Sequence, residues 1–171
     1  MVKKKKVYQG KAFNISLYNF LIGNKRVTHE IIEQNNAAAI LALDKDQIIM
    51  IKQFRYPHKE VLEIPAGIIN KNETSEECAN REFLEETGYI AKKLTHLIRY
   101  YPFLGYNLQY IDCFLATNIK KISEQKLDDE ESITIEKIPL EKLIRMIKNK
   151  KIIDSKTIIS VMIYAAKKKL N

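Results

Sequence analysis

The chain has 171 residues and a formal net charge of +8 at pH 7, because 29 Lys and Arg outnumber 21 Asp and Glu. Its length suits one domain with a core of ordinary size, and no apolar run approaches the roughly 20 residues that cross a bilayer. The N-terminus lacks the apolar segment of a signal peptide, so we expect a soluble, cytoplasmic protein. The positive charge favours phosphate-bearing ligands. No segment has the pattern of a nucleic-acid-binding module, so nucleic acid is the less favoured partner.

The first third of the chain is expected to be mostly β-structure. The run Lys3–Lys6 is interpreted as solvated charge. Phe13–Ile22 and Val27–Glu33 flank a Gly-Asn turn signal and predict a hairpin. Ala37–Leu43 and Ile48–Gln53 flank a short polar turn and predict a second hairpin.

A helix is predicted for about Ser75–Thr87. Thr74 and, three residues later, Glu77 have the spacing of a capping box, in which two side chains satisfy free backbone N–H groups of the first turn. Gly88 follows directly, at the position where a left-handed helix terminator is favoured. The helix is therefore short and bounded at both ends.

Three glutamates project from one side of this helix, because residues three and four apart share a helix face: Glu82, Glu85 and Glu86. They lie beside the apolar stripe of Ala79 and Phe83. Like charges held together near a core require a cation or a raised pKa, and carboxylate oxygens suit Mg²⁺ or Mn²⁺. The alternative interpretation is an ordinary solvated face, since Glu-rich helices are common.

The stretch that ends at Tyr89 combines these glutamates with other residues at fixed spacings, namely Gly67, Glu73, Arg81, Glu82, Glu85, Glu86 and Gly88. The combination resembles the signature of the Nudix hydrolases, which cleave nucleoside diphosphates linked to a further group. Tyr89 is a mild departure, because a branched aliphatic residue is usual there. The resemblance implies an α/β fold, an α/β/α sandwich with a mixed β-sheet in residues 37–171. A small N-terminal β extension in residues 1–36 would precede it as a possible dimerisation element.

Two segments before the signature resemble the ADP-ribose pyrophosphatase branch of this family: Q-F-R, which ends at Arg55, and L-E-I-P-A-G, which contains Ala66. In that branch the arginine matching Arg55 meets the substrate, and the alanine matching Ala66 lends its backbone carbonyl to a metal ion. The resemblance thus implies a site for Mg²⁺ or Mn²⁺ at Ala66, Glu82, Glu85 and Glu86. Without the resemblance, Arg55 would be interpreted as a surface residue that anchors its strand.

Two strands, predicted at Ile90–Tyr100 and Gln109–Thr117, flank an aromatic loop whose side chains suit either base stacking or the core. The loop resembles the Y-P-x-P-G-[FY] segment of the branch and implies substrate contacts at Leu104 and Gly105. Leu104 replaces the second proline, and Gln109 stands where a glutamate is usual. These departures weaken the assignment of ADP-ribose in particular and leave diphosphate hydrolysis unaffected.

An acidic run, Asp128–Glu131, precedes a strand predicted at Ile133–Ile138, and by itself it indicates a surface loop. In the branch a mobile loop carries a glutamate just before such a strand. Glu131 holds the matching place, and Glu130 is the neighbouring alternative. The remaining segments with helical spacing are Leu140–Ile147 and Ser155–Lys169.

The cysteines and histidines are assigned no chemistry. Cys78 and Cys113 form no C-x-x-C pair and are expected to be packed, reduced thiols. The three histidines, His29, His58 and His96, have no metal-ligand spacing.

Taken together, the resemblance implies metal-assisted hydrolysis of ADP-ribose or a related nucleoside diphosphate sugar to AMP and a sugar phosphate. Two or three Mg²⁺ ions would bridge the diphosphate and lower the pKa of an attacking water. Glu131 is expected as general base, Arg81 as the residue that orients a glutamate, and Glu85 as the residue that completes the metal ligands. Two alternatives remain: hydrolysis of a dinucleotide coenzyme or an oxidised nucleotide, and a non-catalytic nucleotide- or RNA-binding module.

Overall fold

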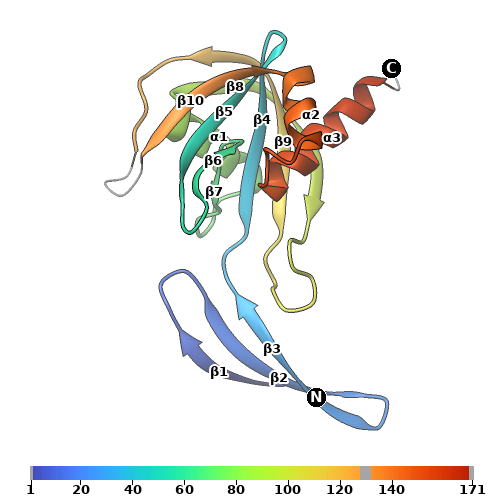
Figure 1. Cartoon of the computed structure of the whole chain (residues 1–171). Helices are drawn as coiled ribbons and strands as arrows, with labels where there is room; N and C mark the ends of the chain where they lie inside the picture. The colour runs from blue at the N-terminus through green and yellow to red at the C-terminus, as the bar shows by residue number, and fades with distance from the viewer. Residues whose placement is uncertain (1, 128–131, 170–171) are drawn as a thin grey trace.

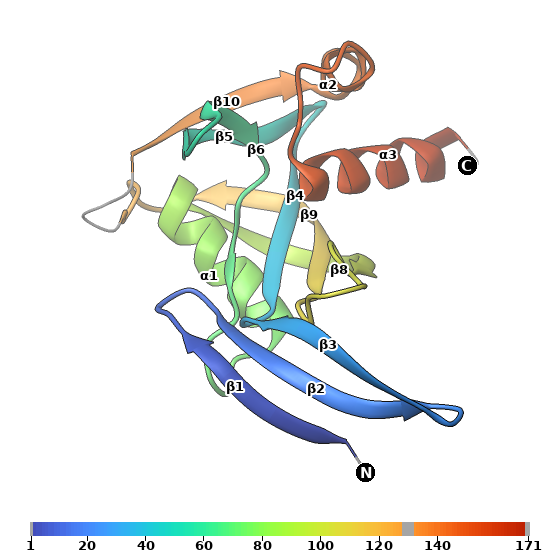
Figure 2. The same cartoon turned by 60° about the horizontal axis from the view of Figure 1, so that its bottom comes forward.

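The computed structural model describes residues 2–127 and 132–169 and contains two β-sheets (Figure 1). A three-stranded sheet is built by the N-terminal segment and lies beside one end of the larger unit. The larger unit is a seven-stranded sheet with helices on both faces (Figure 2). The chain crosses from the small sheet to the large one over residues 34–36.

The small sheet consists of β1 (Lys3–Gln9), β2 (Asn14–Ile22) and β3 (Lys25–Glu33), all antiparallel. The predicted hairpin of β2 and β3 is confirmed. β1 was not predicted, because all seven of its residues are exposed and its sequence therefore shows no alternation of apolar and polar side chains. Its four lysines are solvated, as expected, but they lie on an edge strand that pairs with β2.

The large sheet is mixed and has the order β10-β5-β4-β9-β8, with β6 paired to β5 and β7 paired to β4. β4 and β9 are parallel, and the other pairs are antiparallel. Its strands are β4 (Ala37–Asp44), β5 (Gln47–Arg55), β6 (Lys59–Glu63), β7 (Ala66–Ile68), β8 (Tyr89–Tyr100), β9 (Ile111–Lys121) and β10 (Ile133–Pro139). The predicted second hairpin, β4 and β5, is confirmed. No bounds were predicted for the short strands β6 and β7, since runs of five and three residues carry little periodicity.

Strand β9 begins at Ile111, two residues later than the predicted start at Gln109. The backbone N–H of Gln109 donates to Asn107 Oδ1 at 2.8 Å, and that of Tyr110 donates to Asn36 Oδ1 at 3.0 Å. Because side chains satisfy these donors, the regular pairing of β9 starts only at Ile111.

β4 and β5 separate soon after their turn, and this separation opens the sheet. They pair only over Ala42–Asp44 and Gln47–Ile49. Beyond that point β7 pairs with the first residues of β4, and β6 pairs with the last residues of β5. The two strands diverge visibly in Figure 2, so their far ends form the two sides of an opening in the sheet.

Helices cover both faces of the large sheet, which confirms the α/β/α sandwich (Figure 2). Alternate residues of β4 supply both cores: Ala38 and Ile40 pack with Phe83 of α1 (Ser75–Thr87), whereas Ala39 and Leu41 belong to the cluster on the opposite face. That opposite cluster includes Leu143 of α2 (Leu140–Lys148) and Val161 of α3 (Ser155–Lys169).

The caps predicted for α1 are confirmed. Thr74 and Glu77 form a reciprocal capping box. Gly88 is left-handed with φ 76°, and a Cβ at this position would lie 2.1 Å from the carbonyl oxygen of Ser123. Only glycine therefore fits where the helix ends against the following loop.

The two cysteines are buried and unbridged, as expected. Burial raises the pKa of the Cys78 thiol to about 12 and that of Cys113 to about 11. Within residues 2–127 and 132–169, no helix combines the length and apolar character needed to cross a membrane.

Candidate functional site

A cavity of about 740 Å³ lies where β4 and β5 separate. One part of its wall is acidic and comes from α1: Glu82, Glu85 and Glu86. Another part carries Arg55 and Lys156, and β7 contributes Ala66 and Gly67. The cavity thus brings together the expected metal-binding residues and two further predicted site residues, Arg55 and Arg81.

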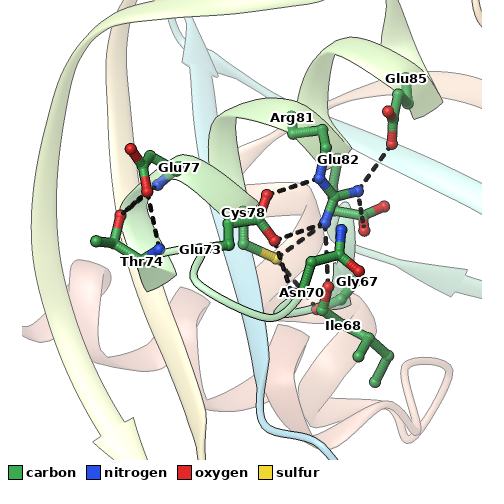
Figure 3. Close-up of polar contacts among 10 residues, drawn as sticks. All are labelled: Gly67, Ile68, Asn70, Glu73, Thr74, Glu77, Cys78, Arg81, Glu82 and Glu85. Carbon is green, nitrogen blue, oxygen red and sulfur yellow. Dashed lines mark hydrogen bonds and ion pairs between the residues drawn. The ribbon is translucent and has the colours of Figure 1, made fainter.

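Arg81 lies within the acidic wall and contacts three carboxylates (Figure 3). Its Nε donates to Glu73 Oε1 at 2.7 Å. Its Nη1 donates to Glu82 Oε1 at 2.6 Å and to Glu85 Oε2 at 2.9 Å. Its Nη2 donates to Glu73 Oε2 and to the carbonyl oxygen of Ile68, both at 3.0 Å. A single guanidinium therefore serves three carboxylates, and these contacts raise its pKa, the bond to Glu73 most of all.

Gly67 allows β7 to approach α1 closely. A Cβ at this position would lie 1.9 Å from the carboxylate carbon of Glu82. Since no larger residue fits without moving that side chain, Gly67 sets the position of Glu82 against the β7 backbone.

Glu86 is the most buried of the three glutamates, with 4% of its surface exposed. Its Oε2 accepts a hydrogen bond from the backbone N–H of Ala66 at 3.0 Å. Its backbone carbonyl accepts from Gln125 Nε2 at 2.6 Å. The carboxylate is therefore held beside Ala66, the residue whose carbonyl was expected to join it in a metal site.

The chemistry of these side chains fits a hard divalent cation. Three carboxylates line the cavity, and Arg81 supplies one positive charge among Glu73, Glu82 and Glu85. Such an excess of negative charge favours an additional cation. In the part of the chain that the structure describes, no three His, Cys, Asp or Glu side chains converge in a geometry that could hold a metal ion. Glu82 and Glu85 are instead turned toward Arg81.

The basic part of the wall is organised around Glu63 of β6, whose side chain is only 3% exposed. Arg55 Nε donates to Glu63 Oε1 at 2.9 Å, and Lys156 Nζ donates to Glu63 Oε2 at 2.5 Å. Lys156 was missed by the sequence analysis. The sequence offered only its place in the first turn of a predicted helix, and nothing local indicates a contact 93 residues away.

Other predicted site residues lie elsewhere. Leu104 is 77% exposed, and Gly105 lines a separate hollow formed with β3 residues Thr28, His29 and Glu30. Their contact with substrate stays a prediction. Gln109 does line the main cavity. Glu130 and Glu131, the alternatives for the general base, lie outside the described residues.

Comparison with known proteins places the chain in a family. The family model described as the NUDIX domain matches residues 33–159. An ADP-ribose pyrophosphatase of Bacillus subtilis (strain 168) is 32% identical over 99% of this chain and 94% of its own length. A methanol dehydrogenase activator of Bacillus methanolicus is 30% identical, covering 94% of this chain and 89% of its own. A GDP-mannose pyrophosphatase of Enterobacter sp. (strain 638) is 28% identical over 78% of this chain and 75% of its own.

A solved structure supports the same fold. The crystal structure of an ADP compounds hydrolase superposes with a TM-score of 0.87 and covers 99% of this chain and 94% of its own. The two sequences are 20% identical, so the likeness concerns the arrangement of the sheets and helices.

Proposed function

The chain belongs to the Nudix hydrolase family, whose members generally use a divalent metal ion, and we propose that it cleaves the diphosphate bond of ADP-ribose or a related nucleoside diphosphate sugar. The products would be AMP, or the corresponding nucleoside monophosphate, and a sugar phosphate. The observation that carries the proposal is one cavity in which three carboxylates of α1 meet basic side chains, among them Arg55 and Lys156. Diphosphate cleavage needs this combination, because the substrate is anionic and its reacting phosphorus requires charge stabilisation.

The acidic wall is proposed as the metal site. Glu82 and Glu86, with the carbonyl oxygen of Ala66, are the main ligands, and Glu85 completes the set. Mg²⁺ or Mn²⁺ is the proposed ion, and when bound it offsets the charge of the diphosphate and lowers the pKa of water. Arg81 orients Glu82 and Glu85 through its present hydrogen bonds.

The basic wall is proposed to bind the phosphates. Arg55 and Lys156 both line the cavity, so they are placed to donate hydrogen bonds to phosphate oxygens. Glu131 stays our proposed general base and Glu130 its alternative, because a carboxylate there would precede β10, which pairs with β5 beside the cavity.

Gln109 is the residue of the cavity wall that bears on the choice of substrate. Gln109 Oε1 accepts from Gln34 Nε2 at 2.7 Å, and its Nε2 donates to the carbonyl oxygen of Asn35, also at 2.7 Å. The cavity wall at this position is therefore an uncharged amide of fixed orientation. Because relatives named for ADP-ribose and for GDP-mannose both match the chain, the proposed substrate class is the nucleoside diphosphate sugars.

We also propose a cytoplasmic homodimer in which residues 1–36 form the dimerisation element and residues 37–171 the hydrolase domain. The small sheet exposes Val7, Tyr8, Leu21 and Ile22, and the neighbouring loop exposes Leu104. The small sheet contacts this loop through β3, where the backbone N–H of Ile32 donates to the carbonyl oxygen of Tyr106 at 2.7 Å. Burying the apolar side chains against a second copy would remove them from water. Sedimentation equilibrium tests this: a monomer at micromolar concentration contradicts it.

Release of nucleoside monophosphate from ADP-ribose, GDP-mannose, a dinucleotide coenzyme and an oxidised nucleotide, with and without Mg²⁺, tests the function. We expect Mg²⁺-dependent turnover of at least one nucleoside diphosphate sugar. Preference for a dinucleotide or an oxidised nucleotide would replace the substrate class and keep the reaction. No turnover of any compound would favour a binding module.

A further inference from the structure

We propose that Glu63 is a positioning residue, whose buried carboxylate holds Arg55 and Lys156 together as one two-pronged anion-binding group in the cavity. This inference rests on the proposed function, and it adds a residue that does not itself line the cavity. Glu63 would act on substrate only through the two cations that it holds.

The contacts of Glu63 join three elements of the fold. Arg55 of β5 donates from Nε at 2.9 Å and from Nη2 at 3.3 Å. Lys156 of α3 donates from Nζ at 2.5 Å. Both donors line the cavity, whereas the carboxylate that joins them is 3% exposed. A buried carboxylate is stable only if it is paired, and here two cations pair with it.

The pair of cations keeps an accessible donor for a ligand. Glu63 supplies one carboxylate for the two cations, and Asp154, which also pairs with Lys156, supplies a second. Within the described part of the chain, the hydrogen bonds of Arg55 use Nε and Nη2, so Nη1 remains for an anion. The Arg55 side chain is 49% exposed, which makes it accessible to a bound phosphate.

Lys156 is fixed from two sides. Its Nζ also donates to Asp154 Oδ1 at 3.0 Å, and Asp154 Oδ2 accepts from the backbone N–H of Thr157 at 3.0 Å. Thr157 Oγ1 in turn accepts from the N–H of Ile64, the residue after Glu63, at 2.8 Å. The first turn of α3 is thereby tied to the end of β6, and the Lys156 side chain is only 12% exposed.

Removing the charge of Glu63 should therefore affect anion binding. Without that carboxylate the two cations repel each other, Arg55 loses the partner that orders its side chain, and Lys156 keeps only Asp154. The metal-binding glutamates on α1 keep their own contacts with Arg81 and Ala66. Substrate affinity should fall while the chemical step is largely retained.

The experiment compares Glu63→Gln with Glu60→Gln, a control on the same strand whose side chain is 71% exposed. In steady-state hydrolysis of the best substrate at saturating Mg²⁺, we expect Glu63→Gln to raise KM about tenfold and to change kcat by less than about threefold. Calorimetric binding of ADP without metal should weaken by a similar factor. The control should leave both quantities unchanged.

A second variant, Lys156→Met, removes one prong and keeps the aliphatic stem. If Glu63 acts through its cations, the effect of Glu63→Gln on the dissociation constant of ADP should shrink in the Lys156→Met background. Fully additive effects, an unchanged affinity in Glu63→Gln, or a loss confined to kcat would each overturn the proposal. Should Glu63→Gln fail to fold, wild-type affinity for ADP in Lys156→Met would overturn it.

The ADP measurement separates this inference from the proposed function. An inactive wild-type protein whose ADP affinity still depends on Glu63 would refute hydrolysis and retain the anion-binding group. An active enzyme whose KM and ADP affinity ignore Glu63 would retain hydrolysis and refute the group.

Discussion

Two clusters around α1 use the same carboxylate and guanidinium chemistry in opposite proportions. At Arg81 one guanidinium contacts three carboxylates, and the side chains of Glu82 and Glu85 are 17% and 41% exposed. At Asp112 of β9 one carboxylate, 3% exposed, accepts hydrogen bonds from three other side chains: Ser75, His96 and Arg99. Ser75 is the first residue of α1, so both clusters hold the same helix.

The difference shows which cluster is suited to bind a ligand. Burial opposes ionisation of Asp112, but hydrogen bonds from Arg99, Ser75 and His96 outweigh it and lower its pKa to about 2. Its charge is matched by donors that the chain supplies permanently. The Arg81 cluster has more negative than positive charge and is open to the cavity, so it can still gain from a cation. We therefore assign function to Arg81 and its neighbours, and stability to Asp112.

The sharpest test of this division is Glu86→Gln. The variant should lose several orders of magnitude in kcat, because a proposed metal ligand is removed, and it should stay folded. Metal-dependent hydrolysis and circular dichroism measure the two effects. Glu76→Gln, at an exposed site in the first turn of α1, is the matched control and should retain activity. Near-normal turnover in Glu86→Gln would contradict the assigned metal site.

Asp112→Asn should show the reverse behaviour. The amide cannot accept the paired hydrogen bonds of Arg99, so we expect about 2–3 kcal/mol less free energy of unfolding. The half-exposed guanidinium can return to water, which limits the loss. Urea unfolding measures it, with Asp46→Asn in an exposed turn as control. If the folded variant lost more than about tenfold in kcat, the cluster would have a functional role that we do not assign.

The comparison also separates what the sequence can and cannot predict. α1 was predictable to the residue, since its capping box and Gly88 are local signals. The Asp112 cluster was not predicted, because its partners lie 13 to 37 residues away on other elements. The cavity likewise depends on the point at which β4 and β5 stop pairing, and no residue type marks it. Motifs in the sequence predicted the glutamates of the acidic wall. The contact of Lys156 with Glu63 in the basic part of the wall became visible only in the fold.

Acid should weaken the Asp112 cluster in a defined pH range. Its folded pKa of about 2 lies below its ordinary value of 3.8, so its contribution to stability is present above about pH 4 and is lost as the pH falls toward 2. The shift corresponds to about 2 kcal/mol at most. Urea unfolding of wild type and Asp112→Asn at pH 7, 4 and 2.5 should show the difference shrinking. A constant difference across this range would contradict the stabilising role of the ionised carboxylate.

Arg81→Lys should give the smallest of these effects and shows whether the Arg81 cluster needs the shape of a guanidinium or only its charge. A lysine keeps one positive charge but cannot contact Glu73, Glu82 and Glu85 with a planar fork. We expect about a tenfold loss in kcat/KM, equivalent to about 1.4 kcal/mol, and a smaller change in the free energy of unfolding. Titration of the metal dependence should show a higher Mg²⁺ requirement, because the two cavity glutamates are less well oriented. Unchanged activity and metal dependence would mean that Arg81 contributes charge alone, so that the cluster is less ordered for function than its hydrogen bonds indicate.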